Sequence, residues 1–466
     1  MKKVIFILIF VVSNILAKDI KIDIEQAISM ALENNHLNKI SKINLEIAQA
    51  QYEQALSANY PSLNAVLYAN RDDTDTIFQQ RGVFNLPASL VGAISALTPL
   101  GTPATTTISA DIDTIAKGRD TVRGSLELNY AIYSGGKIEA IINQAKLNKE
   151  VAKTSIVRSE NEVTFDVKKY YYGYVLTNEL YKLVSKIHKN MDFSTTLAKD
   201  FLEHSSNLKI NKTDYLNVKL TTSLLQSTLT KLDLNKQMLK SAMANLIGLN
   251  WDDEIEIEYK EDEILNQNIS LQKMIERAYI SNPDMNKINL AVQIKEEQIS
   301  ESQAANYPQV GLFGNINKTY NSYEYGYLNK DNENSWNIGI AVKMSLFDGF
   351  RTKNDILEKQ LNKKVIEEQK ILFEEALALQ LKNEFLTSTI GYKQIKILKD
   401  SVDIAIENSE LNLSGFQYEM VEAKDLIQSQ LMETYVKADY LKNIHDYLLS
   451  LATIDKLVGD KINENF

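Results

Sequence analysis

The chain has 466 residues, with 61 acidic and 51 basic side chains and a formal net charge of −10. This charge disfavours sequence-independent nucleic-acid binding, because such binding depends on cationic contacts to phosphates. The chain contains no cysteine, which excludes disulfides, thiolate metal ligands and a cysteine nucleophile.

The first residues have the pattern of a secretory signal peptide. The start is basic at Lys2 and Lys3, residues 4–16 are mostly apolar, and Ala17 is a small residue before Lys18. The apolar run is too short to span a bilayer, and no cysteine follows it to carry a lipid anchor. We therefore predict that residues 1–17 are removed and that the mature chain begins at Lys18.

A helix followed by a strand is predicted next. Residues 24–58 carry apolar side chains three and four positions apart, which is typical of an amphipathic helix. The tripeptide Asn59-Tyr60-Pro61 ends this helix, since a residue before proline is biased out of the helical conformation. After Pro61 the apolar period changes to two, which predicts a strand over residues 62–71. We interpret the tripeptide as a helix-to-strand corner.

A second strand and two helices complete the first half. An alternating segment over residues 122–132 ends in Ser-Gly-Gly, with Gly135 and Gly136 at the return corner from strand to helix. Residues 137–200 contain one glycine and no proline, so we predict a helix of roughly 60 residues, about 90 Å long. A shorter helix is predicted over residues 213–246.

The second half of the chain repeats the first. Residues 22–63 align without a gap on residues 269–310, which lie 247 positions later, and the aligned stretch ends in a second tripeptide, Asn306-Tyr307-Pro308. The spacing is too long for a solenoid repeat. We infer an internal duplication with the same corner in each half.

The remaining elements recur in the same order. The return corner reappears 214 positions later with Asp348 and Gly349, and the glycine of LIGLN, Gly248, recurs 211 positions later as Gly459. Further elements are predicted as strands over 309–320 and 336–346 and helices over 351–413 and 423–457. The chain then divides into a signal peptide (1–17), a first structural repeat (18–250), a linker (251–268) and a second repeat (269–466).

The first half carries an excess of 33 residues between its two corners. The excess falls within residues 71–120, and the stretch 84–103 is unusually apolar for an exposed loop. Its prolines exclude a spanning helix. Folding over a channel mouth, contact with lipid and packing against other copies remain open as roles.

Each predicted strand is about ten residues long, which fits a tilted strand that crosses a bilayer. Alternating strands more often form one face of a soluble sandwich. Four strands behind a signal peptide favour the membrane, but they cannot close a barrel of useful width. Copies from other subunits would therefore be required.

The order of these motifs resembles the TolC-type outer-membrane efflux proteins. The resemblance rests on the duplicated helix–Asn-Tyr-Pro–strand unit, the YSGG and LFDGF corners and residues 414–430, and it covers essentially the whole mature chain. It implies a mainly helical protomer with four strands. Three protomers would form a twelve-stranded barrel in the outer membrane and a helical tunnel, or α-barrel, through the periplasm.

The same resemblance implies a function and partners. The homotrimer would passively conduct drugs or proteins that a periplasmic adaptor and an inner-membrane pump deliver, as in tripartite efflux or type I secretion. The homotrimer would contact outer-membrane lipid. The resemblance implies neither a cofactor nor a bound metal. Which cargo, adaptor and pump belong to the chain stays open.

The resemblance also implies a periplasmic gate. Two acidic residues three positions apart typify the family's constriction; here Asp425 holds the first position and Gln428 the second, so a single carboxylate ring is expected. Asp214 occupies the duplicate position. The family's equatorial motif has two glycines, of which Gly415 is kept and Glu419 replaces the other. From spacing alone, Asp425 would be a solvated residue on a helix face.

Three other function classes fit less well. The four histidines lie far apart, and no GxSxG, GxGxxG or P-loop motif occurs, so an enzyme is not indicated. A general outer-membrane porin would require many more strands in one chain. A secreted periplasmic helical scaffold would explain the helices but neither the strands nor the duplication.

Overall fold

The computed structural model describes residues 20–87, 89–90, 107–204, 210–259, 270–321 and 333–460. The predicted signal peptide 1–17 lies outside these residues, as do most of the apolar stretch 84–103 and the second half of the linker, residues 260–268. The chain forms two compact units. A helical unit comprises Met1–Ala50, Lys146–Ile294 and Asn362–Phe466, and a strand-bearing unit comprises Gln51–Ala145 and Lys295–Leu361.

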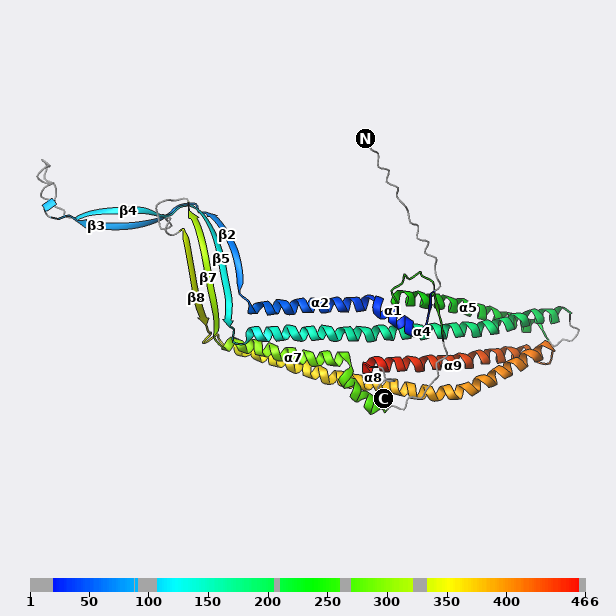
Figure 1. Cartoon of the computed structure of the whole chain (residues 1–466). Helices are drawn as coiled ribbons and strands as arrows, with labels where there is room; N and C mark the ends of the chain where they lie inside the picture. The colour runs from blue at the N-terminus through cyan, green and yellow to red at the C-terminus, as the bar shows by residue number, and fades with distance from the viewer. Residues whose placement is uncertain are drawn as a thin grey trace, which may run out of the picture. The chain divides into compact units, whose positions relative to one another are not determined.

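The helices come in two sets of the same order (Figure 1). The first set is α1 (Ile24–Asn34), α2 (His36–Leu56), α4 (Lys137–His204) and α5 (Lys212–Leu246), and the second is α6 (Leu271–Ser281), α7 (Pro283–Gln303), α8 (Arg351–Gln417) and α9 (Ala423–Val458). Both long helices run through stretches free of proline, which would break the ladder of backbone hydrogen bonds. Within the described ranges, none of the helices is both long enough and apolar enough to cross a membrane.

The prediction of one helix over residues 24–58 is wrong, because the chain breaks at Asn35. The backbone of Asn35 is extended, and its side-chain Oδ1 accepts a hydrogen bond from the Leu37 amide at 2.8 Å. Such a side-chain bond offers the backbone an alternative to the helix and favours a turn. Asn282 makes the same break between α6 and α7, where Pro283 takes the first helical position.

Apolar side chains of the helical unit are buried in three clusters. One lies where α1, α4 and the end of α5 meet the short parallel pair β1 (Ile20–Ile22) and β6 (Ile255–Ile257). A second joins α4, α5, α8 and α9 around Phe416 and Leu426, and a third joins α6, α8 and α9 around Leu381. The helices that contribute to these clusters are therefore held together through their apolar faces.

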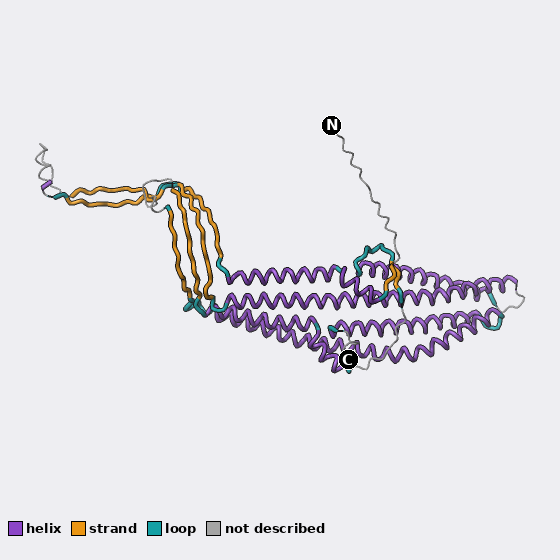
Figure 2. Tube along the Cα trace, viewed as in Figure 1, coloured by secondary structure: helices purple, strands orange, loops and turns teal. Residues whose placement is uncertain are grey.

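Four strands form one antiparallel sheet in the strand-bearing unit (Figure 2). These are β2 (Ser62–Arg71), β5 (Asp120–Tyr133), β7 (Gln309–Asn321) and β8 (Asn334–Lys343), in the order β2-β5-β7-β8. β8 ends three residues before the predicted boundary at 346. The central pair β5·β7 joins the two halves of the chain. β2 and β8 are the outer strands, so each has one edge without a ladder partner in the sheet.

A further hairpin occupies the excess of the first half. β3 (Thr76–Asn85) and β4 (Thr107–Lys117) pair antiparallel and were not among the predicted strands. The hairpin continues from the β2–β5 pair: β3 follows β2 along the chain, and β4 precedes β5. The Asp72 carboxylate forms an ion pair with the Lys117 ammonium at 3.1 Å. The Asp72 backbone amide donates to the carbonyl of Arg119 at 2.9 Å. These contacts fasten the base of the hairpin to the end of the sheet.

Short 3-10 turns lead from helix to strand at both Asn-Tyr-Pro corners. Asn59 and Asn306 end these turns, Tyr60 and Tyr307 are extended, and the strands begin just after Pro61 and Pro308. In each case the tyrosine amide donates back to a carbonyl three residues earlier. At each corner the backbone thus changes from helical to extended within three residues.

The return corners use the left-handed conformation. Gly135, Gly136 and Gly349 have φ angles of 66°, 91° and 69°. A Cβ atom on Gly135 would lie 2.7 Å from the carbonyl oxygen of Ala304, so the first return corner packs directly against the second Asn-Tyr-Pro corner. In the second half, Asp348 accepts a hydrogen bond from the amide of Thr352 at 2.8 Å and caps the start of α8.

Candidate functional site

The predicted gate residue Asp425 lies in the first turn of α9 and is exposed. Ala423 and Leu426 beside it are buried in the cluster that joins α9 to α4, α5 and α8. Burial of that face leaves Asp425 and Gln428, one turn later, exposed on another face of α9. The structure therefore places both residues together on an accessible face near the start of one helix.

Asp214 has a local contact in the structure. Its carboxylate accepts a hydrogen bond from the Asn211 amide, and the Asn211 side chain accepts one from the Asp214 amide, both at 3.0 Å. This reciprocal pair is a capping box for α5. Asp214 is half-buried and stabilises the start of its own helix, so it differs from Asp425 in role and exposure.

A groove lies between α5 and α9, and the sequence did not predict it. Its volume is about 650 Å³, and its lining is Asn217, Leu220, Thr221, Lys424, Ile427, Gln428, Leu431, Met432 and Tyr435. Gln428 lines this groove, whereas Asp425 is not among the lining residues. Leu220, Leu431, Met432 and Tyr435 are exposed, whereas Ile427 is half-buried. In the sequence these residues are visible only as apolar positions outside the buried faces of their helices.

The end of α8 and the loop that follows it contain both positions of the family's equatorial motif, Gly415 and Glu419. A Cβ atom on Gly415 would lie 2.5 Å from Val421, so only glycine fits where the loop folds back. The Met420 amide donates to the Gly415 carbonyl at 2.8 Å. Glu419 has a φ of 58°, a left-handed conformation that costs a residue with a Cβ about 1–2 kcal/mol. Position 419, where the family has its second glycine, thus has the left-handed backbone conformation that glycine favours.

A polar layer lies inside the packing of α4, α8 and α9. Glu433 is only 1% exposed, and its Oε1 accepts an ion pair from Lys186 at 3.1 Å. Its Oε2 has no hydrogen-bond partner within the described part of the chain. Gln430 beside it is buried and donates to the Ser409 hydroxyl at 2.8 Å. Sequence reasoning missed this layer, because Glu433 looks like any helix-face carboxylate.

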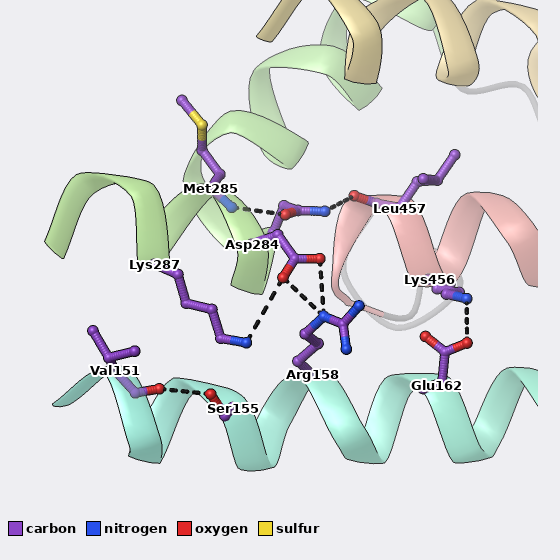
Figure 3. Close-up of polar contacts among 10 residues, drawn as sticks. Val151, Ser155, Arg158, Glu162, Asp284, Met285, Lys287, Lys456 and Leu457 are labelled. Atoms are coloured by element: carbon purple, nitrogen blue, oxygen red, sulfur yellow. Dashed lines mark hydrogen bonds and ion pairs between the residues drawn. The ribbon is translucent and has the colours of Figure 1, made fainter. Parts of the chain in front are cut away.

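Two equivalent junctions tie the broken helices to the ends of α5 and α9. Asn35 donates to the carbonyl of Leu246 at 3.1 Å, and Asn282 donates to the carbonyl of Leu457, 211 positions after Leu246, at 2.8 Å. The bond to Leu457 appears in Figure 3. Each contact links the helix break in one half to the last helix of the same half.

The duplicated glycines complete these junctions. Gly248 and Gly459 have φ angles of 84° and 85°, just after the last helices. A Cβ atom on Gly459 would lie 2.6 Å from the carbonyl oxygen of Ser281, and one on Gly248 would overlap Asn34. Glycine is therefore required at both positions by conformation and by close approach.

Ion pairs link α7 and α9 to α4 beside the second junction (Figure 3). The Arg158 Nε lies 2.8 and 3.1 Å from the two carboxylate oxygens of Asp284, and Lys287 approaches the same carboxylate at 3.8 Å. Burial lowers the pKa of Lys287, and the negative charge of Asp284 acts in the opposite direction without cancelling this shift. Lys456 pairs with Glu162 at 2.8 Å. All are partly solvated, so each contributes modestly to stability.

In the described ranges, no group of three or more His, Asp or Glu side chains has an arrangement that could hold a metal ion. His445 lies 2.9 Å from its neighbour Asp446. Tyr171 is buried in the first apolar cluster and donates to the Glu258 carbonyl at 2.7 Å.

Comparisons of sequence and structure relate this chain to known proteins. The family described as outer membrane efflux protein matches residues 274–460. No curated protein sequence matches the chain.

Several solved structures share the fold. A membrane protein from Pseudomonas aeruginosa has 16% identity and a TM-score of 0.74, over 95% of this chain and 91% of that one. The CmeC outer membrane channel from Campylobacter jejuni has 14% identity and a TM-score of 0.75, over 94% and 85%. The outer membrane protein VceC from Vibrio cholerae has 14% identity and a TM-score of 0.71, over 94% and 96%.

At such identities the structures establish the fold alone, while the sequence match over residues 274–460 is independent of them. The matched family is one of efflux proteins and not of enzymes. Together, the sequence match and the shared fold confirm the resemblance of this chain to the TolC-type outer-membrane efflux proteins.

Proposed function

We propose that the chain is the outer-membrane channel of a tripartite efflux or type I secretion system. It would conduct cargo passively from an inner-membrane pump and a periplasmic adaptor to the outside, with its long helices in the periplasm. The sequence match to efflux proteins and the fold support this function. A general porin or a secreted helical scaffold would leave the duplicated corners and the four-stranded sheet unexplained.

The observation that carries the proposal is the open sheet. A four-stranded sheet with two free edges is too small to enclose a pore, whereas three copies would supply a closed ring of twelve strands. We therefore infer a homotrimer that contacts outer-membrane lipid, with residues 18–250 and 269–466 as the two repeats of each mature protomer. The exposed apolar groove between α5 and α9 fits a helical partner such as the adaptor.

We expect the mature protein, extracted in detergent, to be a homotrimer that begins at Lys18. Closed-ring pairing would satisfy the edges of β2 and β8, which an isolated protomer leaves open. Native mass spectrometry checks both the stoichiometry and the mass of the cleaved chain. A stable water-soluble monomer would contradict the proposal.

We also propose that Asp425 forms the charged ring of the periplasmic gate. Three-fold symmetry places the three carboxylates at one height, where they would concentrate cations and make the channel cation-selective and sensitive to block by multivalent cations. Gln428 adds no charge, so block would depend on this single ring. The exposure of Asp425 supports this role.

The gate is tested with Asp425→Ala in planar lipid bilayers. We expect weaker cation selectivity and weaker divalent block with the trimer intact. The comparison variant is Asp214→Ala, which removes the capping box of α5 and is expected to raise the open probability with little change in block. Unchanged selectivity and block in Asp425→Ala would show that Asp425 is only a solvated helix-face residue.

A further inference from the structure

A second pocket lies between α4 and α9, apart from the groove between α5 and α9. Two ion pairs join these helices on either side of it: Lys168 binds Asp455 at 2.7 Å, and Lys186 binds Glu433 at 3.1 Å. Between these two levels, residues of both helices line a cavity of about 360 Å³, which we call the α4–α9 pocket. Its volume lies within the range of small-molecule sites, about 300–1,000 Å³.

Tyrosines from three different segments line the α4–α9 pocket. Tyr172 lies on α4, Tyr440 on α9, and Tyr259 two residues after the end of β6. Most of the remaining lining consists of leucine, isoleucine and valine side chains of the two helices. Tyr259 is positioned through its neighbour, because the Glu258 carbonyl accepts a hydrogen bond from the buried Tyr171 at 2.7 Å. The rings are therefore held by separate elements around one cavity.

The pocket carries negative charge. The side chain of Glu179 lines it, is 33% exposed, and binds Lys182 on the same helix through Oε1 at 2.7 Å. A carboxylate offers about four acceptor positions on its two oxygens, so one ion pair leaves capacity for a ligand. His445 also lines the pocket and lies 2.9 Å from Asp446. Among the described residues of the lining, none is lysine or arginine.

Aromatic rings of α4 hold ammonium groups elsewhere along the helix. The Nζ of Lys236 lies 4.5 Å from the centre of the Tyr181 ring, and the Nζ of Lys456 lies 4.6 Å from the centre of the Phe165 ring. The negative face of an aromatic ring attracts a cation, and the attraction grows as water is excluded. A pocket lined by three tyrosines and a carboxylate therefore suits a cation that also carries apolar groups.

We propose that the α4–α9 pocket binds a lipophilic organic monocation, such as a hydrophobic amine or a quaternary ammonium or phosphonium ion. The tyrosine rings attract the positive charge, the Glu179 carboxylate neutralises it, and the aliphatic side chains bury the apolar body. An anion of the same shape would meet the carboxylate and the negative ring faces. All lining residues belong to one chain, so the inference goes beyond the proposed channel and does not depend on the trimer.

Tetraphenylphosphonium and tetraphenylborate test the proposal, because the two ions have the same shape and opposite charge. Isothermal titration calorimetry of the detergent-extracted protein measures their binding, with the same detergent alone as the blank. We expect saturable binding of the phosphonium and binding of the borate that is weaker by about tenfold or more. Equal affinities would show an apolar cavity without selection for charge. That result, or the absence of saturable phosphonium binding, would overturn the proposal.

Variants then locate the site. Glu179→Gln keeps the shape of the side chain and removes its charge, and Tyr440→Leu removes one ring; each should weaken phosphonium binding several-fold. Glu150→Gln is the matched control, since Glu150 also lies on α4, pairs with a lysine three positions later, and does not line the pocket. Unchanged phosphonium affinity in both pocket variants, or an equal loss in Glu150→Gln, would contradict this location. Loss of channel conductance with binding intact would affect the proposed function alone.

Discussion

Lys186→Met is expected to destabilise the protein strongly, because it leaves the carboxylate of Glu433 buried without a counter-ion. Glu433 is 1% exposed and one of its oxygens has no partner in the described residues, while Lys186 binds the other oxygen at 3.1 Å. Lys186 is 46% exposed whereas Glu433 is buried, so removing the lysine leaves a buried carboxylate without its partner, at a cost of about 1–3 kcal/mol per protomer. The thermal unfolding midpoint of the detergent-extracted protein should fall by several degrees.

A second variant separates this electrostatic cause from loss of packing. Glu433→Gln keeps the shape of the side chain and removes the charge, so the double variant Lys186→Met/Glu433→Gln should recover most of the lost midpoint. Lys182→Met is the control, since Lys182 pairs with Glu179 at 2.7 Å on the same helix but is exposed. A double variant no more stable than Lys186→Met alone would show that Lys186 acts through packing.

Asn282→Ala is expected to loosen the junction between α6, α7 and α9. Asn282 is 5% exposed; it donates to the Leu457 carbonyl at 2.8 Å and accepts from the Met285 amide at 2.9 Å. Alanine leaves both backbone groups without these partners, at a cost of about 1–3 kcal/mol for each buried group. Hydrogen exchange should accelerate around Met285 and at the end of α9, together with a lower unfolding midpoint.

The equivalent Asn35→Ala should act in the same direction around α1, α2 and the end of α5. Its bond to Leu246 is longer, at 3.1 Å, so we expect a smaller effect. Asn286→Ala, four residues after Asn282 and half-buried, serves as the control for loss of an asparagine in α7. If exchange rose equally in the control, the junction would not depend on Asn282.

The positions of the long helices follow largely from local sequence. Residues 137–200 contain one glycine and no proline, and α4 covers all of them. The change of apolar period from three and four to two likewise marks where β2 begins after Pro61. These features depend on the chemistry of neighbours in the chain, so no distant contact is needed to predict them.

The candidate site was only partly predictable. Asp425 was recognised through a family motif and lies exposed near the start of α9, but nothing in the sequence around Glu433 marks it as buried. Both are acidic residues on the same helix, eight positions apart. Their difference arises from the packing of α4 and α8 against one face of α9, which is a property of the tertiary structure.

The sequence by itself determined the duplicated order of helices, strands and corners, because proline, glycine and apolar period act over a few residues. The tertiary structure decided the helix breaks and the burial of charge. Asn35 and Asn282 break their helices where each can also reach a carbonyl at the end of α5 or α9. Those partners lie 211 and 175 residues away along the chain, and only folding brings them within hydrogen-bond distance.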